Sequence, residues 1–168
     1  AYHEHPVWSK PRVTGWEGRG LTEVRRDAAA HRFESAERAS SFSLVVNRAS
    51  PSAYLRGHGG STFHTLHWLR HLERIGVPVV NGSKVYGYEL SKASQLDALA
   101  DMGLPFPRSV VINDASLAVS AAKDLRYPVL VKANIGGSGA GITRYDTAAA
   151  LEGPVARGEV APGIDGVA

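Results

Sequence analysis

Two lysines and a glycine-rich run are the residues whose types and spacing could bind a polyphosphate. Lys92 lies at the expected start of a helix, Lys132 lies near the end of a strand-like run, and the glycine-rich run 136–141 follows shortly after it. Ammonium groups neutralise phosphate charge, and glycines let backbone N–H groups approach a ligand closely. Taken singly, either lysine could also lie on a solvated surface. Together with the glycine run, they predict a phosphate site if the fold brings them together.

The glycine run fits neither of the two common phosphate-binding loops. A Walker A loop requires Gly-Lys-Ser/Thr at the start of a helix, whereas Gly141 is followed by Ile142 and Thr143. A dinucleotide fingerprint needs a third glycine where Ile142 or Arg144 stands. Glycines cost roughly 0.5–1 kcal/mol each relative to alanine when they are ordered. Because the run joins two strand-like segments, we expect a hairpin loop over phosphates, with an ordinary flexible turn as the alternative.

The elements that must position these residues alternate between strands and helices. We expect strands at 42–47, 77–80, 109–112, 128–133 and 142–145, and helices at 61–75, 91–101 and 114–125. Ser61, Ser91 and Asp114 are the expected N-caps, and Gly76 and Gly103 the expected helix ends. Prolines and glycines predict an irregular segment 1–41 with at most a short helix at 27–38, and a tail from residue 153 without a clear element. This order predicts an α/β fold with a parallel strand–helix–strand unit.

The composition excludes several classes of protein. The 168 residues carry a net charge of +3, include no cysteine and are 43% hydrophobic, as in one globular domain or parts of two. No apolar run is long enough to span a membrane, and no signal peptide opens the chain, so we expect a cytoplasmic protein with no membrane partner. The absence of basic blocks with interleaved aromatic residues argues against nucleic-acid binding.

Three histidines form a second group that could do chemistry. His64, His67 and His71 follow the spacing i, i+3, i+7 of one helix face, with His58 upstream and Glu73 nearby. Imidazoles at this spacing could hold zinc or nickel, but histidines are also typical of helix surfaces and interfaces, and no cysteine or carboxylate other than Glu73 completes the set. We therefore predict no metal ligands in this chain, and the role of the three histidines stays open.

Two long stretches resemble the nucleotide-binding part of the ATP-grasp superfamily. They read ELSKASQLDALADMGLPFPRSVVIND and YPVLVKANIGGSGAGITRYD. The resemblance covers about residues 42–146 and is closest to the RimK-like branch, typified by ribosomal protein S6 modification enzymes and similar to glutathione synthetase. Upstream, LVVNRASPS and LRHLERIGVPVVNG resemble the linker from the preceding domain. The resemblance implies the end of an incomplete pre-ATP-grasp domain at 1–41, a pre-ATP-grasp α/β unit with linker at 42–88, and the N-terminal part of a truncated ATP-grasp domain at 89–168.

Residue by residue, the resemblance implies a nucleotide site. Lys92 would contact the α-phosphate, and Lys132 the α- and β-phosphates and the adenine side. Arg48 is the candidate catalytic residue, and it stands with Asn81 where this branch often places residues near the substrate or nucleotide. The lid over the β- and γ-phosphates would consist of Gly136, Gly137, Ser138, Gly139, Ala140 and Gly141.

The resemblance also implies a reaction, the ATP-dependent ligation of a carboxylate to an amine. The carboxylate of an amino acid, peptide or protein would attack the γ-phosphate, and an amine would then displace phosphate from the acyl phosphate. Magnesium ligands are expected beyond residue 168, so we expect a fragment without ligase activity and with weak nucleotide affinity. A non-catalytic nucleotide-binding or interaction module of the same type is the alternative. The substrate pair and a homo-oligomeric state stay open.

Overall fold

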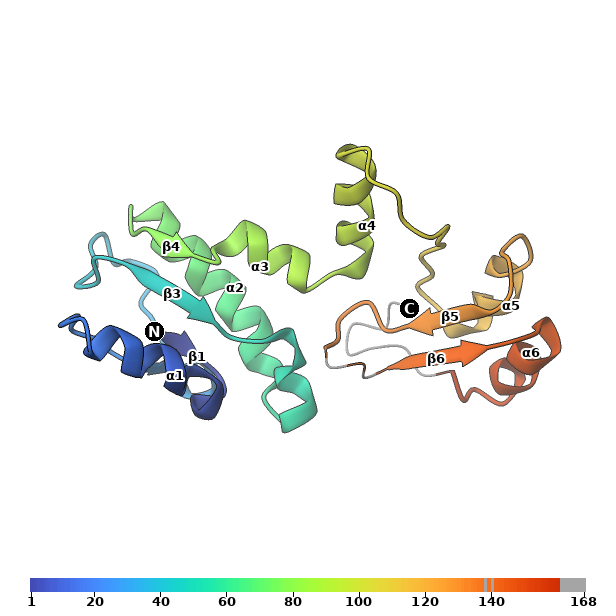
Figure 1. Ribbon diagram of the computed structural model, residues 1–168, viewed down its shortest axis with the longest axis horizontal. Helices are drawn as coiled ribbons and strands as arrows, with labels where there is room; N and C mark the ends of the chain where they lie inside the picture. Colours follow the sequence, from blue (N-terminus) through green and yellow to red (C-terminus); the bar gives the residue numbers. More distant parts are fainter. Residues whose placement is uncertain (138, 140, 161–168) are drawn as a thin grey trace. The chain divides into compact units, whose positions relative to one another are not determined.

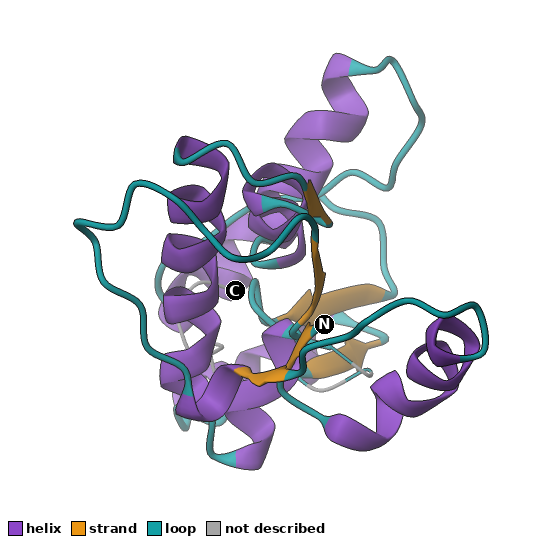
Figure 2. Ribbon diagram, turned by 90° about the vertical axis from the view of Figure 1, so that its left-hand side faces the viewer, coloured by secondary structure: helices purple, strands orange, loops and turns teal. Residues whose placement is uncertain are grey.

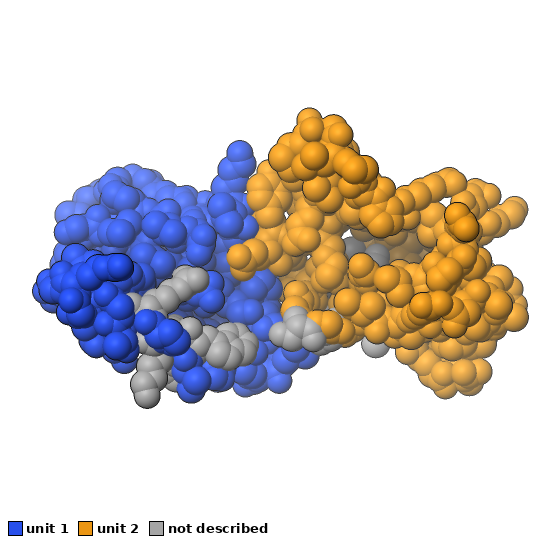
Figure 3. Space-filling model, in the orientation of Figure 1, with its two compact units in different colours: residues 1–87 blue, residues 88–168 orange. Residues whose placement is uncertain are grey.

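The computed structural model describes residues 1–137, 139 and 141–160, and the chain divides into two compact units after Gly87 (Figure 3). Unit 1 comprises residues 1–87, and unit 2 begins at Tyr88. In the described part of the chain, no helix is both long and apolar enough to cross a membrane.

Unit 1 is built on a parallel four-stranded sheet in the order β2-β1-β3-β4 (Figure 1). The strands are β1 (Tyr2–His3), β2 (Arg26–Asp27), β3 (Val45–Arg48) and β4 (Val79–Val80). Helix α1 (Pro6–Glu17) connects β1 to β2, and α2 (Gly59–Arg74) connects β3 to β4. Parallel neighbours require such crossovers, and Figure 2 shows the two helices on opposite sides of the strands. The predicted α/β fold and its strand–helix–strand unit are confirmed.

Packing between α2 and β1 forms the core of unit 1. The ring centroids of Tyr2 and Trp68 lie 4.2 Å apart, and the Tyr2 hydroxyl is 3.3 Å from Oγ1 of Thr65. Leu69 and Leu72 from the same helix are also buried. Burial of this helix face fixes α2 against the strands, since hydrophobic burial is the main favourable term in folding.

The N-terminal region is more regular than the sequence predicts. Helix α1 contains Pro11 and continues through Gly15, so the prediction that breakers keep residues 1–41 irregular is wrong. The expected helix at 27–38 is also wrong. It is replaced by a 3₁₀ turn, Ala28–Ala30, whose first free amide is satisfied because Asp27 Oδ1 accepts a hydrogen bond from Ala29 N at 2.9 Å.

Helix α2 begins earlier than predicted, because Ser61 is not its N-cap. The helix starts at Gly59 after His58, and the Ser61 hydroxyl donates instead to the carbonyl oxygen of His58 at 2.7 Å. A serine inside the first turn can satisfy its hydroxyl in this way without ending the helix. A 3₁₀ helix, Pro51–Arg56, precedes α2, and α3 (Ser83–Glu89) follows β4.

Unit 2 contains an antiparallel pair, β5 (Val129–Lys132) and β6 (Ile142–Tyr145). Three helices accompany it: α4 (Lys92–Asp101), α5 (Ala118–Ala121) and α6 (Ala148–Ala156). The buried cluster of this unit joins α5, β5, β6 and α6 through Ala118, Ala122, Val129, Tyr145, Leu151 and Val160. The caps at Ser91 and Asp114 are confirmed, since these side chains accept from Ser94 N and Ser116 N.

Three predictions for unit 2 are wrong. Residues 109–112 form no strand, and Val110 and Val111 are 47% and 53% exposed. An apolar β-branched run becomes a strand only where another strand pairs with it, and none in the described residues does. The helix expected at 114–125 is a 3₁₀ turn, Ala115–Leu117, followed by the short α5. The tail contains a helix after all, because α6 continues through Gly153 and Pro154.

Candidate functional site

The start of α4 is tied to the end of β5 by Asn134. The Asn134 side chain accepts hydrogen bonds from the Ala93 amide at 3.0 Å and from the Ser91 hydroxyl at 3.2 Å. Its carbonyl oxygen accepts from the Lys92 amide at 3.2 Å. The free amides of the helix start are therefore used within unit 2, which sequence reasoning missed. The two segments are about 40 residues apart in the chain, so no local pattern signals the bond.

The Lys92 ammonium lies at the entrance to the glycine run. Its Nζ donates to the carbonyl oxygen of Ala133 at 2.7 Å and to that of Asn134 at 3.3 Å. These carbonyls belong to the two residues that link β5 to the run. Lys92 thus holds this linking segment in place and brings positive charge to it.

Lys132 provides a second ammonium group with a different environment. It lies on β5 opposite Ile142 of β6, and its side chain is exposed. Among the residues that the structure describes, none forms a hydrogen bond or ion pair with the Lys132 side chain. Its charge is available to a ligand, because no carboxylate among the described residues neutralises it.

Both lysines line one groove of unit 2, with a volume of about 540 Å³. Apart from the lysines and Asn134, its lining is mostly apolar and comes from α4, the extended segment 107–112, α5 and β5, including Leu96, Leu99, Val110, Ala122, Val129 and Val131. An apolar cleft with a few placed polar groups is the usual form of a small-molecule site. A ligand with a flat apolar part and a negatively charged part suits this lining.

The glycine run begins and ends beside β5. The Ala133 amide donates to the carbonyl oxygen of Gly141 at 3.0 Å, and Ile135 is buried at the base of the loop. Gly139 and Gly141 have φ values of +77° and +69°, in the left-handed region that favours glycine. Ser138 and Ala140 lie outside the described residues. The strands on either side of the run, β5 and β6, pair antiparallel, as the expected hairpin requires.

Replacing Gly141 with alanine should destabilise unit 2 more than replacing Gly139. Both positions have positive φ, which costs an alanine about 1–2 kcal/mol. A Cβ on Gly141 would lie 3.0 Å from Cβ of Ala133, whereas one on Gly139 would meet nothing within 4 Å. We expect Gly141→Ala to lose roughly 1 kcal/mol more in urea denaturation, because the crowded loop must shift. Equal losses in the two variants would show that the contact with Ala133 does not matter.

The structure places Arg48 and Asn81 in unit 1. Arg48 ends β3 opposite His3 of β1, and its Nε is buried without a hydrogen-bond partner among the described residues. Asn81 and Asn47 exchange hydrogen bonds, each side-chain amide donating to the other's backbone carbonyl at 3.1 Å. These two hydrogen bonds join Asn47, near the end of β3, to Asn81, the residue that follows β4.

The histidines of α2 do not gather around one point. His64 Nε2 lies 3.0 Å from Nδ1 of His31, His67 is exposed, and His71 is buried and accepts from Arg74 at 3.0 Å. The described residues contain no group of three histidine, aspartate or glutamate side chains that could hold a metal ion. Burial, together with smaller effects of the neighbouring His64 and Arg26, lowers the pKa of His31 to about 4. His31 is therefore neutral at pH 7.

Sequence reasoning also missed a buried carboxylate, Glu4. Its side chain is 1% exposed and accepts from Nε of Arg56 at 2.8 Å, from a second guanidinium nitrogen of Arg56, and from Nδ1 of His58 at 2.9 Å. The hydrogen bonds from Arg56 hold the pKa of Glu4 below its usual value. More than 50 residues separate Glu4 from these partners, so the sequence carries no signal for the cluster.

Comparisons with known proteins relate more than half of this chain to one family of enzymes. Residues 91–161 match the family described as carbamoyl-phosphate synthase L chain, ATP binding domain. The chain is similar to the carbamoyl phosphate synthase large chain of Hyperthermus butylicus, with 35% identity over 103 residues, which are 56% of this chain and 10% of the relative. The large chain of Pyrobaculum aerophilum is 33% identical over 112 residues, 62% of this chain and 11% of the relative. The chain thus spans about a tenth of the length of these curated relatives.

A solved structure resembles nearly the whole chain. The RimK domain protein ATP-grasp of Sphaerobacter thermophilus superposes with a TM-score of 0.70 and 18% identity, covering 93% of this chain and 57% of that one. Identity at this level supports the fold alone.

Proposed function

We propose that ATP binds in the groove of unit 2, because the chain has the ATP-grasp fold and its residues 91–161 match the family model of an ATP-binding domain. The observation that carries the proposal is the pair of ammonium groups on this groove beside the glycine loop. One ammonium group orders the loop, and the other has no protein partner among the described residues. The apolar lining would take the adenine ring.

The residues would divide the work of binding. Lys132 would pair with phosphate oxygens, because it lines the groove with a charge that no described residue compensates. Its place near the adenine side rests on the sequence resemblance. Lys92 would add charge near the α-phosphate while it holds the carbonyls of Ala133 and Asn134. Residues 136–141 would cover the β- and γ-phosphates with backbone N–H groups. Ser138 and Ala140 are included on the sequence resemblance only.

ATP-grasp enzymes are ATP-dependent ligases, and we propose that the protein to which this chain belongs joins a carboxylate to an amine. Candidate substrates are an amino acid or a peptide, with an acyl phosphate formed on the carboxylate. In such a reaction the lysines and the loop would position the triphosphate and neutralise its charge, because phosphoryl transfer depends mainly on these effects. The described residues bring no magnesium-binding set of carboxylates together, so no step is assigned to that ion. Arg48 stays a candidate catalytic residue on the sequence resemblance only.

Titration of the chain with a fluorescent ATP analogue tests nucleotide binding directly. We expect saturable binding that ATP and ADP reverse in the millimolar range or below, and that adenosine reverses much less well. Added salt should weaken binding, because phosphate–lysine attraction is screened. Binding that adenosine reverses as well as ATP would contradict a phosphate site, and so would no saturable binding at all. Because we expect this chain alone to have no ligase activity, amide formation or robust turnover of ATP by it would overturn that expectation.

A further inference from the structure

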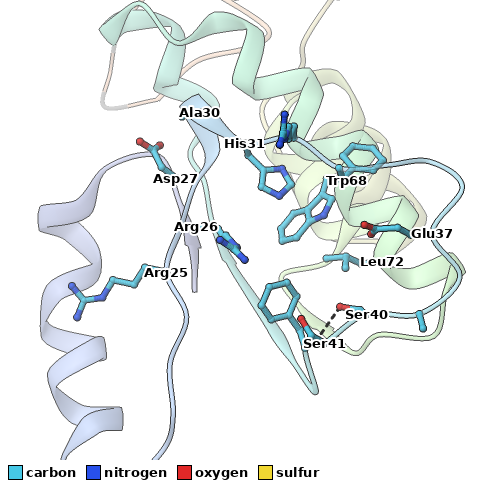
Figure 4. A pocket seen from close by; sticks show the side chains of 14 residues that line it. Arg25, Arg26, Asp27, Ala30, His31, Glu37, Ser40, Ser41, Trp68 and Leu72 are labelled. Carbon is cyan, nitrogen blue, oxygen red and sulfur yellow. Dashed lines mark hydrogen bonds between the residues drawn. The ribbon is translucent and has the colours of Figure 1, made fainter.

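Unit 1 contains a pocket of its own, with a volume of about 550 Å³ (Figure 4). It is lined by the edge strand β2, the irregular segment after it and α2. No step of the proposed ATP chemistry uses these residues. The proposed ATP site therefore does not explain why unit 1 contains this pocket.

One wall of the pocket is aromatic and apolar. Trp68 and Leu72 of α2 are 3% and 2% exposed, and the His31 ring lies 4.4 Å from the Trp68 ring, centroid to centroid. His31 is bound to His64 and is neutral at pH 7, so this wall carries no charge from His31. Phe33 and Phe42 also line the pocket. Such walls favour a flat ring, which can stack on or meet their edges.

Arg26 brings a cation to this wall. Its guanidinium carbon lies 5.7 Å from the centroid of the Phe42 ring, and Figure 4 shows the side chain directed toward the pocket. Among the described residues, no carboxylate pairs with Arg26. A guanidinium held over an aromatic face is well placed to form two parallel hydrogen bonds with a carboxylate.

The neighbouring charges leave a small positive excess in the pocket. Arg25 and Asp27 also line the pocket, but in Figure 4 the Arg25 side chain is directed away from Arg26, and it forms ion pairs with Glu17 at 3.3 Å and Glu23 at 3.8 Å. Asp27 also points away, and its carboxylate caps the turn that follows β2. Arg32 lines the pocket without a described partner, and Glu37 lies on the far side, beyond Trp68 and Leu72 from Arg26. Two cations and one anion favour a ligand with a single negative charge.

We propose that this pocket binds an aromatic carboxylate, with its ring against Trp68 and His31 and its carboxylate on Arg26. This site is independent of the ATP site, since every residue that lines it belongs to unit 1. The two proposals can therefore fail separately. Phosphate monoesters fit less well, because a second charge would lack a partner beside Arg26.

Calorimetric titration of the full chain with 2-naphthoate tests the proposal. We expect saturable binding, and a loss of affinity of about tenfold or more for the neutral analogue 2-naphthylmethanol, since the charge-assisted hydrogen bonds are absent. Arg26→Ala should weaken the binding of 2-naphthoate by about the same factor. Arg26→Lys should weaken it less, because lysine keeps the charge and loses only the paired hydrogen-bond geometry.

Arg25→Ala is the matched control, because it removes the same group from the adjacent residue, whose side chain is directed away from Arg26 and is already paired with Glu17 and Glu23. It should leave 2-naphthoate binding within about twofold of the unaltered chain, because exposed charges act weakly at a distance. Circular dichroism should show that each variant is folded. The proposal fails if 2-naphthoate does not saturate, if the neutral analogue binds equally well, or if Arg25→Ala and Arg26→Ala have the same effect. ATP titration of Arg26→Ala should match that of the unaltered chain whether or not the pocket binds carboxylates.

Discussion

Replacing Glu4 with glutamine should cost unit 1 roughly 3 kcal/mol of stability, the low end of the range for breaking a buried ion pair. The Glu4 side chain is 1% exposed and accepts three hydrogen bonds, two of them from Arg56. Glutamine has nearly the same volume but no charge, so Arg56 would lose its counter-ion. Arg56 is 26% exposed and can recover some hydration, which places the cost at the low end. Urea denaturation followed by circular dichroism measures the loss.

The matched control is Glu159→Gln, which breaks a surface pair of the same type. Glu159 accepts from Nε of Arg157 at 2.7 Å, but both side chains are more than half exposed. Surface ion pairs contribute little, so this variant should unfold close to the unaltered chain. If Glu4→Gln were as stable as Glu159→Gln, the buried cluster would not stabilise unit 1.

The Glu4 variant should also change how stability depends on pH. The pKa of Glu4 is lowered in the folded chain by Arg56, so the unfolded chain takes up a proton at a higher pH than the folded chain. Its contribution is therefore present above the ordinary glutamate pKa and is lost as the pH falls through the lower folded value. Stability of the unaltered chain should fall more steeply below about pH 4.5 than that of Glu4→Gln.

Local sequence patterns predict several helix ends in this chain, although not the start of α2. Ser91 and Asp114 cap where they are expected to, because an N-cap bond joins residues only two or three positions apart. Gly76 and Gly103 follow their helices with positive φ, at +82° and +66°. Patterns fail where breakers stand inside a helix, as Pro11 does in α1.

Strand prediction depends on partners that the local sequence does not reveal. The run 109–112 has the residue types of a strand but no partner in the described residues. The run 42–47 becomes a strand only from Val45, where pairing with Val79 of β4 begins. Hydrogen bonding between distant segments decides both outcomes, and residue preference alone cannot supply it.

The residues of the candidate site also fall into those that the sequence identifies and those that only distant contacts reveal. The lysines and the glycine run could be identified from residue types and from the resemblance to ATP-grasp proteins. Asn134, which fixes Lys92 and the helix start, could not, because its contacts join residues about 40 positions apart. Glu4 with Arg56, and His31 with His64, were missed for the same reason.

Lys132→Ala should weaken ATP binding by about 10–100-fold, the loss expected when a charge-assisted contact worth about 1.5–3 kcal/mol is removed. Lys132 lines the groove, and its ammonium has no partner among the described residues, so its removal leaves no protein group unsatisfied. Stability in urea should change little, whereas displacement of a fluorescent ATP analogue should require much more ATP. Adenosine binding should change far less, because it lacks the phosphates.

Two comparisons make the Lys132 result specific. Lys123→Ala removes the same charge from an exposed position of unit 2 outside the groove, so it should leave ATP affinity nearly unchanged. Lys92→Ala should lower both ATP affinity and stability, because Lys92 also holds the carbonyls of Ala133 and Asn134. If Lys132→Ala and Lys123→Ala bound ATP equally well, the net positive charge of the chain would explain the binding, and Lys132 would not be part of the site. If Lys132→Ala loses ATP affinity and keeps its stability, Lys132 contacts the ligand and does not support the loop. Lys92→Ala cannot make this distinction, because it is expected to lower both affinity and stability.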